Sequence, residues 1–430
     1  MNSIIDTSWD FVNSNTKELT HCYHNYPAMM IPQIARRLIH EYKQKSTNLL
    51  LDPYCGSGTS LVESNMQGIN AIGFDINPLA ILLSKSKTTK FSIELIKQGI
   101  QIFYDELDNH LFAMNSQFGL FNMHQENGYK TQIKNNNQTF KNIDFWYKPE
   151  IIGNLSKIKH FIKNKIHPDV QLFFLTAFSE TSREVSLTRN SEFKLFRMKQ
   201  IKIDDFNPDS FSIFLQKLNR NLIGLESYTN KIENNAESKV FMFNTCYQSP
   251  LELIDDKIDL IVTSPPYGDS RTTVAYGQFS RLSNQWLDFP DAEKVDNSLM
   301  GGKTNRYMNG FEVTSAKKEF ELIKEIDSKR FDEVNSFTFD YYNSIKNISE
   351  VVNKNAFVCY VLGNRTVKGV QIPLDKITVE FFESFGYHHI NTFVRRIPNK
   401  RMPSRNSPTN ETGITGSTMS NEYIVVMKKM

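Results

Sequence analysis

The sequence predicts an α/β fold, in which a Rossmann-like sheet is interrupted by a largely helical insertion. Residues 49–59 read as an apolar strand, a glycine-rich turn and the start of a helix, and residues 71–75 read as a second strand that ends in a carboxylate. Another apolar run, residues 258–262, predicts a buried strand that leads into a proline-rich loop. Ligands of open α/β sheets bind at such strand ends, so we expect a site where these loops meet.

The first strand–turn–helix unit predicts a pocket for a nucleoside-bearing cofactor. Gly56 and Gly58 would let the backbone approach a ligand closely, and Asp75 is placed to accept hydrogen bonds from ribose hydroxyls. The loop does not contain a complete Gly-x-Gly-x-x-Gly fingerprint, which disfavours a dinucleotide. A plain turn between a strand and a helix would contain such glycines too, and the spacing to Asp75 favours the cofactor pocket.

Residues 261–268 read Ile-Val-Thr-Ser-Pro-Pro-Tyr-Gly, and this loop predicts a clamp for an amino group. Pro265 and Pro266 fix φ and lack backbone donors, so the loop presents carbonyl acceptors and side chains. Ser264 adds a hydroxyl acceptor, and Tyr267 adds a flat face on which a heteroaromatic ring could stack. The structural alternative is an ordinary Pro-Pro turn that is capped by a partly buried tyrosine.

The remaining elements follow from apolar periodicity. Helical spacing recurs between residues 93 and 107, from residue 146 to 175 and again over residues 211–225. Further strands are expected at residues 240–243, 357–362, just after 386 and 421–427. We therefore divide the chain into a cofactor-binding half (1–91), a mostly helical insertion with a possible role in target recognition (92–238), and a catalytic half with a basic C-terminal arm (239–430).

Together, these segments closely resemble the amino-group DNA methyltransferases, which methylate N4 of cytosine or N6 of adenine with S-adenosylmethionine. Residues 52–59, Asp-Pro-Tyr-Cys-Gly-Ser-Gly-Thr, match the cofactor loop of that family, and residues 263–267 match its catalytic loop. Residues 24–35 resemble the segment that packs over the methionine end of the cofactor. The resemblance covers residues 21–85 and 255–290 well and implies a Rossmann-like methyltransferase sheet.

The resemblance also implies roles for individual residues. Asn244 stands where family members often carry an aspartate that binds the adenine of the cofactor, and this departure puts its assignment in doubt. The implied cofactor-binding residues are Tyr26, Pro27, Asp52, Tyr54, Gly56, Gly58, Thr59, Asp75, Asn244 and Thr263. The implied catalytic residues are Ser264, Pro265, Pro266 and Tyr267.

Within the family, Ser-Pro-Pro-Tyr usually marks cytosine-N4 enzymes, whereas Asp-Pro-Pro-Tyr or Asn-Pro-Pro-Tyr usually marks adenine-N6 enzymes. We therefore expect a site-specific DNA methyltransferase of a restriction-modification system. It would transfer a methyl group to N4 of a flipped cytosine, whose amino nitrogen attacks the methyl group directly. Three alternatives stay open: an adenine-N6 enzyme, an RNA guanine-N2 methyltransferase and a catalytically silent nucleic-acid-binding module. The recognition sequence and the monomer or dimer state stay open as well.

The cysteines disfavour other chemistries. Ring-carbon methylation of cytosine needs a thiolate, usually in Pro-Cys-Gln, and none of the four cysteines has such a setting. Their scattered spacing predicts neither a metal site nor a disulfide framework. Since the chain contains no apolar run of bilayer length and no leader-like segment, we expect a cytoplasmic protein.

The expected partner is double-stranded DNA, with a cognate restriction endonuclease as a functional partner. The formal net charge of +3 would not by itself indicate a polyanion, so the distribution of charge matters more. Residues 393–405 contain five basic and no acidic side chains and two prolines, which predicts an exposed arm, although a solvated loop would look the same. The candidate DNA-binding residues are Arg271, Arg395, Arg396, Lys400, Arg401 and Arg405.

Overall fold

A computed structural model describes residues 3–117, 139–189, 192–232, 235–255, 257–269, 273–303, 311–397, 405–406, 416–417 and 419–430. Within these residues, eight strands form one mixed, mostly parallel sheet in the order β1-β9-β12-β6-β5-β2-β3-β4. Its strands are β1 (Ser3–Ile5), β2 (Leu49–Asp52), β3 (Asn70–Asp75), β4 (Ser238–Met242), β5 (Ile258–Thr263), β6 (Val352–Leu362), β9 (Tyr387–Arg396) and β12 (Asn421–Lys429). Two short hairpins pair β7 (Thr366–Val367) with β8 (Val370–Gln371) and β10 (Arg405–Asn406) with β11 (Gly416–Ser417).

The strand order creates a switch point between β2 and β5. The chain runs from β2 to β3 and β4 on one side, and then returns to pair β5 with the other side of β2. All these neighbours are parallel, with Leu50 opposite Leu260 and Leu51 opposite Ile261. Crossovers that leave such a point in opposite directions open a crevice at the carboxyl ends of the two strands. The loops after β2 and β5 both lie there.

The last strand of the chain closes the other half of the sheet. β12 inserts between β6 and β9 and is antiparallel to both. The strand predicted near the C-terminus is thus confirmed, and so are the strands predicted at residues 240–243, 258–262 and 357–362, with small shifts of their ends.

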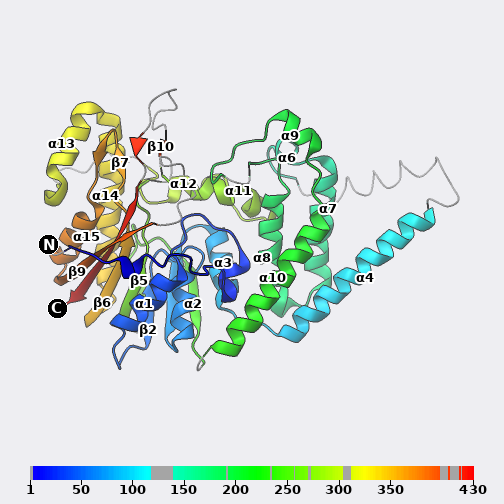
Figure 1. Cartoon of the computed structure of the whole chain (residues 1–430), viewed down its shortest axis with the longest axis horizontal. Helices are drawn as coiled ribbons and strands as arrows, with labels where there is room; N and C mark the ends of the chain where they lie inside the picture. The colour runs from blue at the N-terminus through cyan, green and yellow to red at the C-terminus, as the bar shows by residue number, and fades with distance from the viewer. Residues whose placement is uncertain are drawn as a thin grey trace.

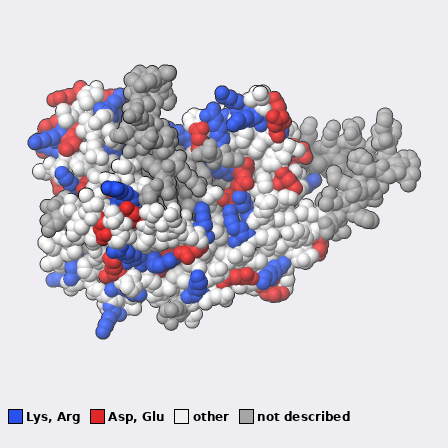
Figure 2. Space-filling model, in the orientation of Figure 1, with Lys and Arg blue, Asp and Glu red and all other residues white. Residues whose placement is uncertain are grey.

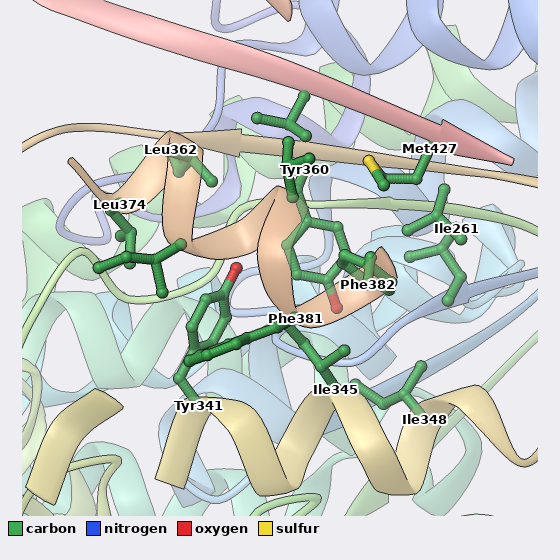
Figure 3. Packing of buried hydrophobic residues seen from close by; sticks show 14 of the residues in the cluster. Ile261, Tyr341, Ile345, Ile348, Tyr360, Leu362, Leu374, Phe381, Phe382 and Met427 are labelled. Atoms are coloured by element: carbon green, nitrogen blue, oxygen red, sulfur yellow. The ribbon is translucent and has the colours of Figure 1, made fainter. Parts of the chain in front are cut away.

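Helices cover both faces of the sheet, and alternate strand residues face each side. Leu50 and Leu260 pack with α1 (Pro32–Tyr42), α2 (Thr59–Met66) and α3 (Pro78–Thr88). Leu51 and Ile261 point the other way, toward α13 (Lys317–Ile326), α14 (Ser328–Ser349) and α15 (Leu374–Ser384). Figure 3 shows this second core, in which α14 meets α15 and β6 through Tyr341, Ile345, Ile348, Phe381, Phe382 and Tyr360.

On this face of the sheet, α15 packs against β9 and β12 and also contacts α14. Short 3₁₀ turns complete the connections: η1 (Thr7–Trp9), η2 (Leu19–Tyr23), η3 (Pro250–Glu252) and η4 (Thr314–Ala316). No helix of the described ranges is both long and apolar enough to span a bilayer.

The insertion is mostly helical, as predicted, and lies beside the sheet (Figure 1). Its core also includes residues from the catalytic half, because Leu282 and Trp286 of α11 (Tyr276–Trp286) pack into it. The Trp286 ring makes edge contacts with Tyr147 and Phe178. The two parts are therefore packed together through α11, which α12 (Val295–Ser298) follows. The helices of the insertion are α4 (Ile93–Gln117), α6 (Ile143–Trp146), α7 (Pro149–Lys165), α8 (Pro168–Glu184), α9 (Gln200–Asp205) and α10 (Ser210–Lys231).

Candidate active site

A pocket of about 620 Å³ opens at the carboxyl ends of β2, β3 and β5. This volume includes space that is open to solvent. Nine of its lining residues were predicted from the sequence: Tyr26, Pro27, Asp52, Tyr54, Gly56, Thr59, Asp75, Ser264 and Pro266. The structure thus brings the predicted cofactor loop and the predicted catalytic loop to one pocket.

Asp52 ends β2 and lies buried at the floor of the site. Its Oδ1 accepts hydrogen bonds from the Thr263 hydroxyl at 2.5 Å and from the backbone N–H of Tyr54 at 3.2 Å. Burial outweighs the lowering effect of these hydrogen bonds, and together with the nearby charge of Asp75 it raises the pKa of Asp52 to about 6. The carboxylate is therefore held in place but is costly to ionise, which favours a cationic ligand beside it.

Asp75 ends β3 and faces the same pocket. Its Oδ2 accepts a hydrogen bond from the backbone N–H of Gly56 at 3.0 Å, and its Oδ1 accepts one from that of Asn77 at 2.8 Å. Burial raises the pKa of Asp75 to about 6 as well. A carboxylate oxygen has more than one acceptor site, so both oxygens can still accept hydrogen bonds from a ligand.

The two glycines of the cofactor loop have different tasks. Gly56 lines the pocket with φ +47°, in the left-handed region that glycine adopts without strain. Gly58 has φ +83°, and a Cβ on it would come within 2.9 Å of the backbone of Ser84 in α3. Gly58 therefore allows α3 to pack closely against the start of α2, and it does not line the pocket.

Two other predicted cofactor residues lie outside the pocket lining. Thr263 is buried and acts through its hydrogen bond to Asp52. Asn244 uses its side chain within the loop after β4, where Oδ1 accepts from the N–H of Cys246 at 3.0 Å and Nδ2 donates to the carbonyl of Ser298 at 3.2 Å. The assignment of Asn244 to the cofactor adenine remains a prediction.

Aromatic residues form one wall of the pocket. Tyr26 stacks against Tyr276, with ring centroids 6.1 Å apart and planes at 29°. Its hydroxyl accepts a hydrogen bond from the side chain of buried Asn77 at 3.0 Å. Asn77 also caps α3 by accepting from the N–H of Leu79. This arrangement fixes the Tyr26 ring at the pocket.

Sequence reasoning missed several lining residues, among them Tyr276. Tyr276 is partly buried and begins α11. An aromatic start to a helix carries no motif, although the helical spacing of the following apolar residues, including Phe279 and Leu282, was a usable signal. The other residues not singled out individually for the pocket are Ala28, Met29, Met30, Cys55, Ser57, Ser60 and Leu299.

The catalytic loop follows β5 directly. Ser264 and Pro266 line the pocket, whereas Pro265 is buried behind them. The Tyr267 hydroxyl lies 3.3 Å from the Ser264 Oγ and donates to Oε1 of Glu422 at 3.2 Å. The Tyr267 ring is partly buried and packs against the sheet core, so a carboxylate from the final strand orients it. Its role as a stacking face for a base remains a prediction.

The expectation of an exposed basic arm is wrong for residues 393–396, which form the end of β9. Arg395 is buried, and its guanidinium makes a 2.7 Å ion pair with Glu422 on β12. A residue held in this way is not available to phosphates, whereas Arg396 is exposed. Arg405 lies in β10, where the structure describes the backbone alone. Arg271, Lys400 and Arg401 lie outside the described residues.

The four cysteines and Arg183 are all buried. All four cysteines are free and buried, and burial raises the pKa of Cys55 well above its ordinary value. Across the described ranges, no group of acidic, histidine or cysteine side chains is arranged to hold a metal ion. Arg183 of α8 is buried, and its guanidinium donates hydrogen bonds to backbone carbonyls.

The residues of the pocket fit a cofactor that carries a nucleoside and a cationic group. Asp52 and Asp75 supply negative charge where a sulfonium or ammonium group would be attracted. The free acceptor sites of Asp75 suit ribose hydroxyls, and the Tyr26 and Tyr276 rings supply an apolar, π-rich wall. Ser264 and Pro266 leave acceptors at the same pocket for a second substrate.

A mostly parallel sheet with an acidic cofactor loop and a Ser-Pro-Pro-Tyr loop at its switch point defines a methyltransferase that acts on amino groups. Comparison with known proteins agrees with this class. A family model described as DNA methylase, for N6 and N4 methyltransferases, matches residues 2–86. The type II methyltransferase M.MvaI of Kocuria varians is 43% identical over 97% of this chain and 93% of its own length. The chain therefore belongs to the N6/N4 DNA methylase family and is an S-adenosylmethionine-dependent DNA methyltransferase.

More distant relatives are consistent with this membership. The type II methyltransferase M.MjaII of Methanocaldococcus jannaschii is 23% identical over 82% of this chain and 78% of its own length. A tRNA (guanine(10)-N2)-dimethyltransferase of the same organism is 32% identical over only 16% of this chain and 19% of its own. The rRNA methyltransferase AviRa of Streptomyces viridochromogenes aligns over 94% of this chain and 88% of its own, with 10% identity and a TM-score of 0.33, a likeness too low to add to the argument.

Proposed function

We propose that this protein methylates N4 of cytosine in double-stranded DNA, as the modification enzyme of a type II restriction-modification system. The observation that carries the proposal is the placement of Ser264 and Pro266 in the same pocket as Asp52 and Asp75. The amino-group acceptors and the acidic cofactor residues thus face one space. A cognate endonuclease that cuts the unmethylated site would be a functional partner, as the type II names of two relatives suggest.

The neutral hydroxyl of Ser264 supports cytosine as the target base. An exocyclic amine shares its lone pair with the ring and is a poor nucleophile until acceptors hold its N–H groups. Ser264 Oγ and the Pro265 carbonyl would hold them and favour a pyramidal nitrogen. The cofactor, when bound, supplies an electrophilic methyl group on a sulfonium sulfur. Positioning then accounts for most of the catalysis, and no covalent enzyme intermediate is needed.

The base must leave the duplex to reach this pocket, at a cost of a few kcal/mol. Stacking on Tyr267 would offset that cost by roughly 1–3 kcal/mol. The hydrogen bond from Tyr267 to Glu422 fixes the ring before the base arrives. We also propose that residues 92–238 contribute to target recognition, since the insertion packs against α11 beside the pocket.

Methyl transfer from labelled S-adenosylmethionine to unmethylated duplex DNA, with structured RNA in parallel, tests the proposal. We expect label in DNA and none in RNA. Ser264→Ala, which removes only the acceptor hydroxyl, should bind the cofactor normally by calorimetry and transfer methyl groups far more slowly. Label in RNA alone would contradict the proposal, and so would an unchanged rate for Ser264→Ala.

A further inference from the structure

Between α8 and α9 of the insertion, a short hairpin brings residues 187–189 beside residues 196–198 through a single antiparallel β-bridge between Thr188 and Arg197. The N–H of Arg189 donates to the carbonyl of Phe196, and the N–H of Met198 donates to that of Leu187, each at 2.8 Å. Residues 190–191 lie outside the described residues. The bridge and these two hydrogen bonds hold residues 187–189 and 196–198 side by side.

The hairpin is linked by hydrogen bonds to α11, the helix whose first residue lines the pocket. The buried guanidinium of Arg183 donates to the carbonyls of Glu192 in the hairpin and Phe279 in α11, at 2.9 Å each. It also lies 4.1 Å from the centroid of the Phe279 ring. The same helix begins at Tyr276, which lines the pocket. The hairpin therefore has a fixed position relative to the active site.

The outer face of the hairpin and the start of α9 combine aromatic and basic side chains. Residues 189–202 contain five basic side chains and one acidic side chain. Phe193 and Phe196 are 43% and 45% exposed, so part of each ring faces solvent, while Phe193 also contacts the ring of Phe279 and Phe196 lies under the guanidinium of Arg189. Lys199 and Lys202 are exposed, and neither forms an ion pair within the described part of the chain. Figure 2 shows Lys and Arg side chains at the upper edge of the molecule, where α9 lies, with Asp and Glu side chains beside them.

We propose that this face, defined as residues 192–202, contacts the DNA duplex that the active site methylates. Lys199 and Lys202 would neutralise backbone phosphates, and the exposed Phe196 would contact the edge of a groove. Basic and aromatic residues alternate on this face, which fits a nucleic acid better than an acidic protein. The phosphates of a nucleic acid match the basic side chains, and its bases match the flat apolar rings. The inference rests on the proposed function, since it places the duplex beside the pocket.

The test measures binding of a fluorescein-labelled 30-bp mixed-sequence duplex by anisotropy over a series of salt concentrations. We expect Lys199→Gln/Lys202→Gln to weaken binding at least tenfold. The slope of log Kd against log salt should fall by about 2, since each lost phosphate contact removes about 0.9. Phe196→Ala should weaken binding without changing the slope. The matched control is Lys43→Gln/Lys45→Gln, two exposed lysines between α1 and β2, at the amino end of β2 and thus at the end of the strand away from the pocket.

The outcomes separate this inference from the proposed function. In one outcome the parent protein binds and methylates DNA while Lys199→Gln/Lys202→Gln binds the duplex as well as Lys43→Gln/Lys45→Gln does. That result would contradict the proposed DNA face and leave the proposed function standing. A parent protein that transfers no methyl group to DNA contradicts the proposed function. If the 199/202 pair loses affinity for a single-stranded RNA of equal length but not for the duplex, the face binds RNA and the inference is wrong.

Discussion

The hydroxyl of Thr263 donates a 2.5 Å hydrogen bond to Asp52, and this bond joins the last residue of β5 to the last residue of β2. It crosses the switch point of the sheet, with the cofactor loop on one side and the catalytic loop on the other. Both groups are buried, so water does not compete for the bond. The two loops of the site are thus coupled before any substrate binds.

Thr263→Val should damage both halves of the site. The change keeps the shape of the side chain but removes a donor to a buried carboxylate, at a cost of about 1–3 kcal/mol. We expect a weaker cofactor affinity by calorimetry and a slower single-turnover methyl transfer. Thr263→Ser, which keeps the hydroxyl, is the control. Parent values for both quantities in Thr263→Val would contradict the coupling.

Asp52→Asn should stabilise the cofactor-free protein near neutral pH. Burial raises the pKa of Asp52 to about 6 from its ordinary 3.8. The folded state therefore binds extra protons between these values, and the contribution of this group to stability is greatest below about pH 4 and is lost as the pH rises through about 6. Asparagine keeps Oδ1 as the acceptor for Thr263 and Tyr54 but carries no charge.

Thermal unfolding of the parent and Asp52→Asn at a series of pH values from 4 to 7 measures this effect. The gain should be on the order of 1–3 kcal/mol at pH 7 and should shrink toward zero at pH 4. Cofactor affinity should fall in the same variant, because the charge that attracts the sulfonium is gone. A gain that is independent of pH would show that the charge of Asp52 is not its cause.

Gly58→Ala should destabilise the fold more than Gly386→Ala. Both glycines have φ +83°, so each substitution carries the same left-handed penalty of roughly 1–2 kcal/mol. A Cβ at Gly58 would also lie 2.9 Å from Ser84, whereas a Cβ at Gly386 would meet no atom within 4 Å. Overpacking adds about 1–3 kcal/mol at the first position only. Denaturant unfolding of the two variants gives the difference directly, and equal losses would refute the packing role of Gly58.

Tyr267→Ala and Asp75→Ala should separate the two substrates. Loss of the Tyr267 ring should reduce methyl transfer strongly and leave cofactor binding almost intact, since Tyr267 is not among the residues that line the pocket. Loss of the Asp75 carboxylate should raise the cofactor dissociation constant first. Calorimetry and steady-state kinetics on both variants give the comparison. An equal loss of both functions in Tyr267→Ala would argue against its role with the base.

Much of this site could be predicted because its motifs are local. The residues of the cofactor loop adjoin one another in sequence, and the strand before each loop fixes where the loop emerges. The link between Tyr267 and Glu422 joins residues far apart in the chain, and it depends on β12 inserting next to β6. No local sequence pattern indicates that β12 pairs between β6 and β9.

The error at Arg395 has the same origin. A run of basic residues and prolines is typical of an exposed loop, but Arg395 lies directly opposite Glu422 in the antiparallel pairing of β9 with β12. Strand register is a property of the folded sheet, and opposite charges at one register position favour a cross-strand pair. The sequence contains both residues without indicating that they meet.

The most direct test of the central claim is the identity of the methylated base. DNA that has been methylated by the purified protein is digested to nucleosides, and the products are identified by mass spectrometry. The account predicts N4-methylcytosine in the parent reaction and its loss in Ser264→Ala. N6-methyladenine would keep the fold and the cofactor site but would contradict the assignment of Ser264 to a cytosine amino group.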